Sequence, residues 1–141
     1  MIKIETQVND PGVIKMIELT TKKLKSLGPF LDNVGTLLLG SVNKNFEQDG
    51  RPAKWTSLAE STIKRRKHGG TKPLQDTGNL KNSMGKVISG NMVSVAPSVT
   101  YGIFHQYGTT RIPERPFNMI QDEDMPKIMK IFEHYLGDGA Q

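Results

Sequence analysis

The start of the chain changes from a strand pattern to a helix pattern. Residues 2–8 alternate apolar or β-branched residues with charged or amide residues, which is the two-residue period of a half-buried strand. An aspartate and a proline at 10–11 suit an N-cap and a first helical position, and a glycine and a proline at 28–29 end the helical spacing. We therefore expect a strand over 2–8 and a helix over about 10–27.

The next segment carries the most apolar stripe of the chain. It begins near Pro29, and Asp49-Gly50 closes it. Its large apolar residues recur at helical spacing at Phe30, Val34, Leu37, Leu38, Val42 and Phe46. A stripe of this width is typical of a helix that faces the core.

A short helix and a basic loop are expected after this long helix. Ser57 is followed three residues later by Glu60, which is the spacing of a capping box and predicts a helix that starts at Ser57. Like charges, a glycine pair and a proline then oppose regular structure. The sequence therefore predicts a mobile basic loop over about 65–75.

The second half of the chain predicts a hairpin and two helices. Residues 84–88 and 92–96 have strand composition and flank a turn-forming trio. Thr100 suits the cap of a brief helix that ends at Gly108. Acidic residues at 122–124 suit the positive end of a terminal helix.

The order of these elements indicates one domain. Neither an internal repeat nor a linker divides residues 1–141. We expect an α+β fold in which a small antiparallel β-sheet has long helices packed on one face. A short turn or helix at 76–80 would place Leu80 inward.

Composition and charge narrow the class of protein. The 141 residues include no cysteine and no apolar stretch near the ~20 residues of a membrane span. The alternating start is unlike a secretory signal, so we expect neither export by that route nor a membrane partner. The net charge is +5, but residues 51–86 hold nine basic and two acidic residues, a net charge of +7. A local contact with a partner or a polyanion is expected at Lys64, Arg65, Arg66, Lys67 and Lys72.

The residue pattern predicts no catalytic, metal or cofactor site. The three histidines lack the spacing of metal ligands, and the chain has neither a nucleophile elbow nor a phosphate-cradling loop. Asp122, Glu123 and Asp124 could in principle hold magnesium for a nuclease-like reaction. Complementarity to the helix dipole is the preferred explanation of these three acidic residues.

An ordered series of short motifs runs through the second part of the chain. Its members are Trp55, Leu58 and Thr62, then Leu74, Thr77, Gly78 and Leu80, then Tyr101, His105, Gln106 and Gly108, and finally Arg115, Pro116 and Phe117. Over about 30–135 this series resembles the phage virion morphogenesis family, the tail completion or tail terminator proteins of tailed bacteriophages and prophages, including the Mu-like group.

The resemblance implies a structural protein and no catalysis. Such a protein caps the tail tube, stops its polymerisation and prepares the tail for head-tail joining. Related terminators assemble as rings, commonly hexameric, so the implied partners are copies of the chain, the tail tube and neck or connector proteins. The implied location is the tail or neck of the virion, with assembly in the host cytoplasm. The motif residues would then be structural or interface residues.

Two other classes of protein stay open at this point. A sequence-independent nucleic-acid-binding protein would use the basic 51–86 region. Because that region lacks interleaved aromatic residues, its contact would be with backbone phosphates, including those of DNA in the tail lumen. A small hydrolase or metal-dependent nuclease would rest only on scattered serines, the histidines and the acidic residues 122–124.

Overall fold

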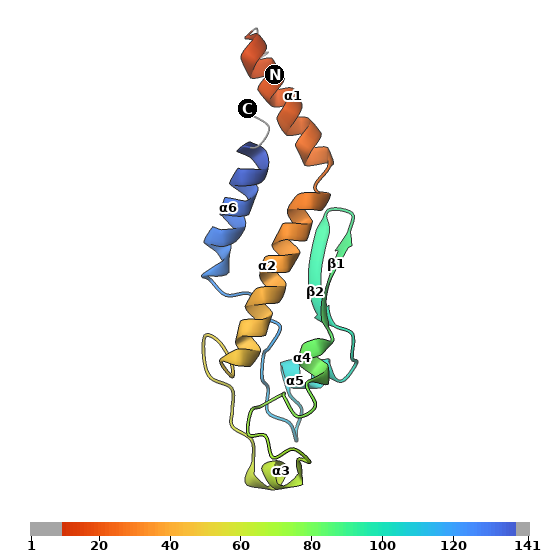
Figure 1. The fold of residues 1–141 in the computed structure, drawn as a ribbon, viewed down its shortest axis with the longest axis vertical. Coiled ribbons are helices and arrows are strands. Elements are labelled where there is room, and N and C mark those ends of the chain that lie inside the picture. Colours follow the sequence, from red (N-terminus) through yellow and green to blue (C-terminus); the bar gives the residue numbers. More distant parts are fainter. Residues whose placement is uncertain (1–9, 138–141) are drawn as a thin grey trace, which may run out of the picture.

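Two long helices form the axis of the molecule. The structure, a computed structural model, describes residues 10–137. Helix α1 (Pro11–Lys25) and helix α2 (Gly28–Glu47) follow each other with a short break (Figure 1). The carboxylate of Asp10 caps α1, because it accepts hydrogen bonds from two backbone N–H groups of the first turn. Both predicted helices are confirmed, whereas the strand predicted over 2–8 lies outside the described residues.

A β-hairpin packs against α2. Strands β1 (Met84–Ser89) and β2 (Met92–Pro97) are antiparallel, and Gly90 in the turn between them has a φ of +58°. Gly35 permits the close approach of α2, since a Cβ there would lie only 2.9 Å from Cγ2 of Val93. The predicted hairpin is therefore confirmed.

Helix α6 (Asp124–Gly137) packs on another side of α2, so that α2 lies between α6 and the hairpin (Figure 1). The ring of Phe30 lies 5.4 Å from that of Phe132 and 5.8 Å from that of Tyr135, centroid to centroid. The Tyr135 hydroxyl also donates to the carbonyl of Lys23 in α1, at 2.7 Å. The molecule is one small α+β domain, as predicted, in which α2 contacts the sheet directly and α6 packs on α2.

The main hydrophobic core lies at the C-terminal end of α2. It consists of Val42, Phe46, Trp55, Leu80, Met84 and Phe117. The ring of Phe46 lies 5.7 Å from that of Trp55 and 5.5 Å from that of Phe117. Three short helices lie towards this end of the molecule (Figure 1): α3 (Glu60–Arg65), α4 (Asn79–Asn82) and α5 (Gly102–Tyr107).

Two predicted helix starts are wrong, because tertiary contacts override the local capping signals. Helix α3 begins at Glu60, and no side chain caps it. The backbone carbonyl of Ser57 instead accepts a hydrogen bond from Arg115. Helix α5 begins at Gly102 without a cap from Thr100. Gly102 is buried, and a Cβ there would lie only 2.9 Å from Cγ of Pro97 and 3.2 Å from Cδ1 of Leu80.

The basic loop has no helix or strand over residues 66–78. The Nη1 atom of Arg66 donates to the carbonyls of Gly70 and Lys72, at 2.9 and 2.8 Å, which folds the loop back on itself. Gln75 Nε2 donates to the carbonyl of Phe46 at 2.7 Å. The predicted lack of regular structure is confirmed from residue 66 onward, and the predicted mobility of the loop stays a prediction.

Candidate functional site

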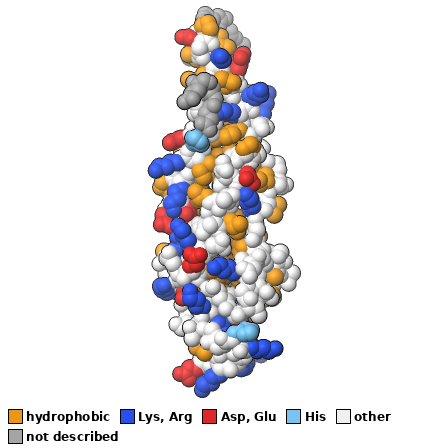
Figure 2. All heavy atoms as spheres, viewed as in Figure 1, with side chains coloured by type: hydrophobic (Ala, Val, Ile, Leu, Met, Phe, Trp, Pro, Cys, Tyr) orange, Lys and Arg blue, Asp and Glu red, His pale blue; other side chains and the backbone are white. Residues whose placement is uncertain are grey.

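The α3 end of the molecule contains an open hollow of about 780 Å³. Eight of the motif residues line it: Leu58, Thr62, Leu74, Thr77, Leu80, Tyr101, His105 and Arg115. The charged residues of its lining are Arg65, Arg66, Arg111 and Arg115 against Asp76. Four arginines and one aspartate make the hollow cationic, and Figure 2 shows basic side chains at this end as well as along one side of the molecule.

Arg115 is the most buried charge in the hollow, with 5% of its surface exposed. Its Nε atom donates to the carbonyl of Thr56 at 2.8 Å, and its Nη2 atom donates to the carbonyl of Ser57 at 3.2 Å. Burial, and then the positive charge of Arg66, lower the pKa of Arg115 below its usual value. The two carbonyls hold the guanidinium in place without neutralising it.

His105 lies beside this guanidinium on α5. Its Nδ1 atom is buried and has no hydrogen-bond partner among the described residues. Burial, and then the charge of Arg115, lower the pKa of His105 below the usual 6.5. Its ring meets that of Tyr101 edge to face at 6.2 Å between centroids. The imidazole is therefore neutral at neutral pH.

Gln106 ties α5 to the segment that contains the Arg-Pro-Phe motif. Its Oε1 atom accepts hydrogen bonds from the backbone N–H groups of Phe117 and Asn118, at 3.1 and 3.0 Å. Gly108 ends α5 with a φ of +74°, and a Cβ there would lie 2.8 Å from the backbone N of Glu114. These contacts fix the backbone that surrounds the hollow. The lining itself does not include Gln106, Gly108 or the buried Phe117.

Two further motifs also have structural roles. Trp55 is buried in the core, and its Nε1 atom donates to the carbonyl of Pro116 at 3.0 Å. Gly78 has a φ of +79° and precedes α4, so the Thr77-Gly78 turn directs Leu80 into the core as predicted. Together with the Arg115 contacts, these bonds join the segment at 55–57 to the segment at 115–117.

The predicted cluster of five cationic contacts divides into two groups. Arg65 and Arg66 line the hollow. Lys64, Lys67 and Lys72 are exposed and do not line it. The structure thus separates two arginines that line the hollow from an open lysine group that lies outside it.

An apolar surface lies on α5 next to the hollow. Ile103, Phe104 and Tyr107 have 58%, 53% and 72% of their surface exposed. Aromatic side chains are usually found in a core or at an interface, and the exposure of Phe104 and Tyr107 excludes the core for these two. Exposed large apolar residues on neighbouring positions are typical of an interaction surface.

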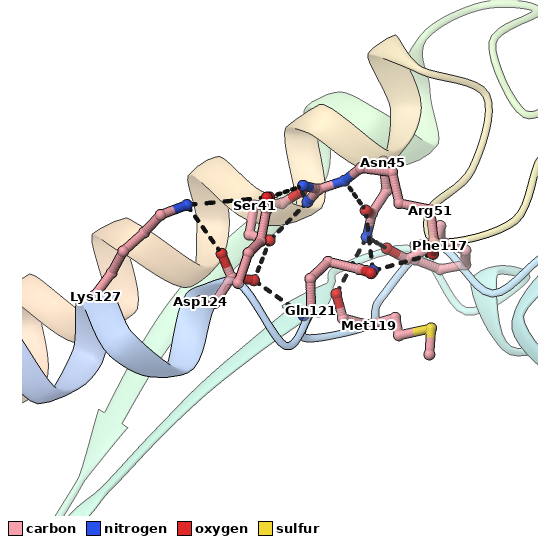
Figure 3. A network of polar contacts seen from close by, with 9 residues as sticks. Ser41, Asn45, Arg51, Phe117, Met119, Gln121, Asp124 and Lys127 are labelled. Carbon is pink, nitrogen blue, oxygen red and sulfur yellow. Dashed lines mark hydrogen bonds and ion pairs between the residues drawn. The ribbon is translucent and has the colours of Figure 1, made fainter.

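A buried polar network, which the sequence analysis missed, joins α2 to the start of α6 (Figure 3). Asp124 accepts hydrogen bonds from the hydroxyl of Ser41 and, at 3.0 Å, from the backbone N–H of Gln121. Arg51 Nη2 donates to both the carbonyl and the hydroxyl of Ser41, each at 2.8 Å. Arg51 also pairs with the exposed Glu123. The network clamps α6 to α2.

Asn45 completes this network from the buried face of α2. Its Nδ2 atom donates to the carbonyls of Phe117 and Met119, at 2.8 and 3.2 Å. Its Oδ1 atom accepts from Arg51 Nε at 2.9 Å. The available signal in the sequence was a pair of polar residues, Ser41 and Asn45, one helical turn apart within the apolar stripe.

The ionisation of Asp124 follows from this environment. Burial alone would raise the pKa of the carboxyl. Hydrogen bonds from Ser41 and from the backbone of Gln121, together with the charges of Lys127 and Arg51, outweigh burial and hold the pKa below the usual 3.8. Asp124 is therefore a charged carboxylate within the polar network that joins α2 to α6. This role goes beyond the complementarity to the helix dipole that the sequence predicts.

Two arrangements that are common in catalytic sites are not formed among residues 10–137. No group of three His, Asp or Glu among residues 10–137 is placed to hold a metal ion. His105 makes no side-chain hydrogen bond to a described hydroxyl or carboxylate, so the pairing that a nucleophile or a general base requires is not formed there. No described helix is long and apolar enough to cross a membrane.

The chain is similar to known proteins over most of its length. The model of the phage virion morphogenesis family matches residues 8–137. The Mu-like prophage FluMu G protein 1 of Haemophilus influenzae is 30% identical over 132 residues, covering 85% of this chain and 90% of the relative. No solved structure matches the chain.

Proposed function

The chain belongs to the phage virion morphogenesis family, and from this premise we propose that it completes the bacteriophage tail. Membership of this family gives the chain a structural role in virion assembly. In the proposed role it caps the growing tail tube, ends polymerisation and prepares the tail for joining to the head. The protein then remains in the tail or neck of the virion after assembling in the host cytoplasm.

Two separate apolar surfaces carry the proposal. One is the α5 surface formed by Ile103, Phe104 and Tyr107. The other is on α6, where Met125 and Met129 are each 53% exposed and lie one turn apart. A protein that works by docking on other proteins requires such surfaces, whereas a soluble monomer exposes few of them.

Two different surfaces also suit assembly of the chain into a ring. A head-to-tail contact joins one surface of a subunit to another surface of its neighbour, and it closes into a ring when the rotation allows. The basic 51–86 region and the slightly acidic remainder would steer such a contact. We expect a homo-oligomeric ring, as in the commonly hexameric terminators, that also contacts the tail tube and neck or connector proteins.

The open lysine group supports one second candidate, sequence-independent binding of nucleic acid. Lys64, Lys67 and Lys72 are exposed on the basic loop and would contact backbone phosphates. Such binding must weaken steeply as salt rises, because each neutralised phosphate releases counterions. Binding to unrelated DNA duplexes with a steep salt dependence near physiological ionic strength would favour this candidate, and no measurable binding would remove it.

Electron microscopy of particles assembled without this gene tests tail completion. The expected particles are overlong or uncapped tails beside separate DNA-filled heads, and a copy of the gene supplied in trans restores complete virions. Normal infectious particles in the absence of the gene would refute the proposed function.

A further inference from the structure

We propose that the hollow is a socket for a carboxylate side chain carried by an acidic, partly apolar segment of a partner protein. Arg115 and Arg66 are its charge partners. The inference deepens the proposed function, and it rests on that function only in taking the partner to be a virion protein.

The first argument is the uncompensated positive charge. None of the arginines that line the hollow lies within 4.0 Å of a carboxylate oxygen of the described residues, although other ion pairs form elsewhere. Asp76 is the one acidic residue in the lining. A charge as buried as that of Arg115 is ordinarily paired, because removal from water is costly. A carboxylate from outside the chain would supply the missing counter-charge.

The second argument is the supply of unused hydrogen-bond donors. A guanidinium carries five N–H donors, and Arg115 engages Thr56 and Ser57 through Nε and Nη2 only. Arg66 engages Gly70 and Lys72 through Nη1 only. Each side chain therefore keeps donors that suit the two oxygens of a carboxylate. The buried Nδ1 atom of His105, which also lacks a described partner, lies on the same wall.

The third argument selects a protein over nucleic acid as the occupant. Leu58, Leu74, Leu80, Ile112, Pro113 and Tyr101 form an apolar part of the wall around the arginines. A phosphate backbone presents charge on a continuous polar ribbon and is better matched by the exposed lysines of the basic loop. A carboxylate side chain with apolar neighbours matches both the charge and the apolar wall.

NMR titration of the full-length protein tests the socket. The probe is the peptide Leu-Asp-Glu-Leu with an acetylated N-terminus and an amidated C-terminus, and its matched control is Leu-Asn-Gln-Leu with the same blocked ends, which has a similar shape and no carboxylate. We expect the acidic peptide to shift the ring signals of His105 and the Nε signal of Arg115 saturably, with at least about tenfold higher affinity than the control. Equal affinity of the two peptides would overturn the proposal. So would stronger perturbation of the same signals by a short DNA duplex.

Charge-removal variants locate the site. Removing Arg66 and Arg111 together, as R66Q/R111Q, takes two charges from the hollow. The matched variant K64Q/K67Q takes two charges from exposed positions close by in the chain. We expect R66Q/R111Q to weaken peptide binding at least about tenfold, because both side chains line the hollow, and K64Q/K67Q to weaken it less than about twofold, because those two charges lie outside the lining and are screened by water and salt. An equal loss in both variants would show a diffuse basic surface and would overturn the socket.

The test avoids removing Arg115, because that side chain holds the backbone at 56–57. The circular dichroism spectrum and the fluorescence of Trp55, the sole tryptophan, report whether each variant is folded. Absent peptide binding together with defective tails in particles without the gene would remove the socket and leave tail completion in place. Peptide binding together with normal particles in the absence of the gene would remove tail completion and leave the socket in place.

Discussion

Gly50 shows how one residue fixes the turn after α2. It has a φ of +109°, and a Cβ there would lie 2.6 Å from the carbonyl oxygen of Ala53 and 2.7 Å from the backbone N of Trp55. We expect Gly50→Ala to lower the free energy of unfolding by about 2–4 kcal/mol, since it combines backbone strain with a clash against backbone atoms. Urea unfolding followed by Trp55 fluorescence measures this change.

Gly40 provides the matched control for that substitution. It lies inside α2 on an exposed face, and a Cβ there meets nothing within 4 Å. Gly40→Ala is expected to raise the free energy of unfolding by about 0.5–1 kcal/mol, because alanine loses less backbone freedom on folding. A stable Gly50→Ala variant would contradict the turn geometry described here.

His105 gives a prediction about pH. Because its pKa is lowered in the folded state, the unfolded chain takes up a proton below pH 6.5 that the folded chain does not. This residue therefore destabilises the fold progressively as the pH falls from about 6.5, and it has no such effect above that pH. We expect His105→Gln to reduce this loss of stability in urea unfolding measured on both sides of pH 6.5. An unchanged pH dependence would show that the imidazole is not desolvated.

Arg115 marks the limit of sequence reasoning at the residue scale. The family resemblance singles it out, and the proline after it predicts an extended backbone. Its burial and its bonds to Thr56 and Ser57 could not be predicted, because those partners lie far away in the chain. The choice between a structural turn and a partner contact also needed the structure, which gives Arg115 a structural role and a place in the hollow.

At the scale of elements, the network around Asp124 holds α6 on α2. Asp124→Asn is expected to lower the free energy of unfolding by about 2–4 kcal/mol, because it removes a buried charge that accepts two hydrogen bonds. The exposed Asp122 is the control, and Asp122→Asn should lower the free energy of unfolding by less than about 1 kcal/mol, the size of an exposed interaction with the helix dipole. Equal effects of the two substitutions would show that the polar network around Asp124 does not contribute to the free energy of unfolding.

The same carboxylate adds an acid-dependent term to stability. Because the folded pKa of Asp124 lies below the usual 3.8, its stabilisation is present above that value and is lost as the pH falls through the folded pKa. In acid unfolding, the Asp124→Asn variant should therefore lose less stability than the natural chain as the pH falls below 3.8.

Local patterns predicted most elements, and tertiary contacts account for the errors. The long helices and the hairpin follow from hydrophobic periodicity and turn residues, which are local properties. The predicted start at Ser57 is wrong where the distant Arg115 binds the Ser57 carbonyl, and α5 begins at the closely packed Gly102 with no cap from Thr100. Ser41 and Asn45 were polar positions in an apolar stripe, but their partners come from distant segments that only the fold brings together, namely the start of α6 and the segment that contains Phe117.

At the scale of the whole molecule, a variant of the exposed α5 surface can distinguish an effect on assembly from an effect on folding. Phe104 and Tyr107 are largely exposed, so F104S/Y107S should change the free energy of unfolding by less than about 1 kcal/mol. If this surface docks on another subunit or on a tail protein, the double variant should restore infectivity to gene-deficient particles at least about tenfold less well than the natural chain. Full restoration by a folded double variant would exclude α5 as a docking surface.

The hollow is a property of the whole fold. Its lining comes from residues 56–66, 74–80, 101–105 and 111–115, and no local pattern predicts that these segments meet. The resemblance supplied many of its residues in advance, because the motif series includes positions in each of these segments. The division of the basic residues into arginines that line the hollow and lysines that lie outside it became visible only with the fold.

The most direct test of a structural role is the stoichiometry of rescue. Isotope-labelled protein is added in increasing amounts to a lysate of particles assembled without the gene, and infectious titre and particle-bound label are measured after gradient purification. If the protein is a component of the virion, the infectious titre should rise in proportion to the protein added and saturate at a fixed number of copies per particle. The label should then stay with the purified particles. Full rescue by less than one copy per particle, with no label retained, would contradict the account.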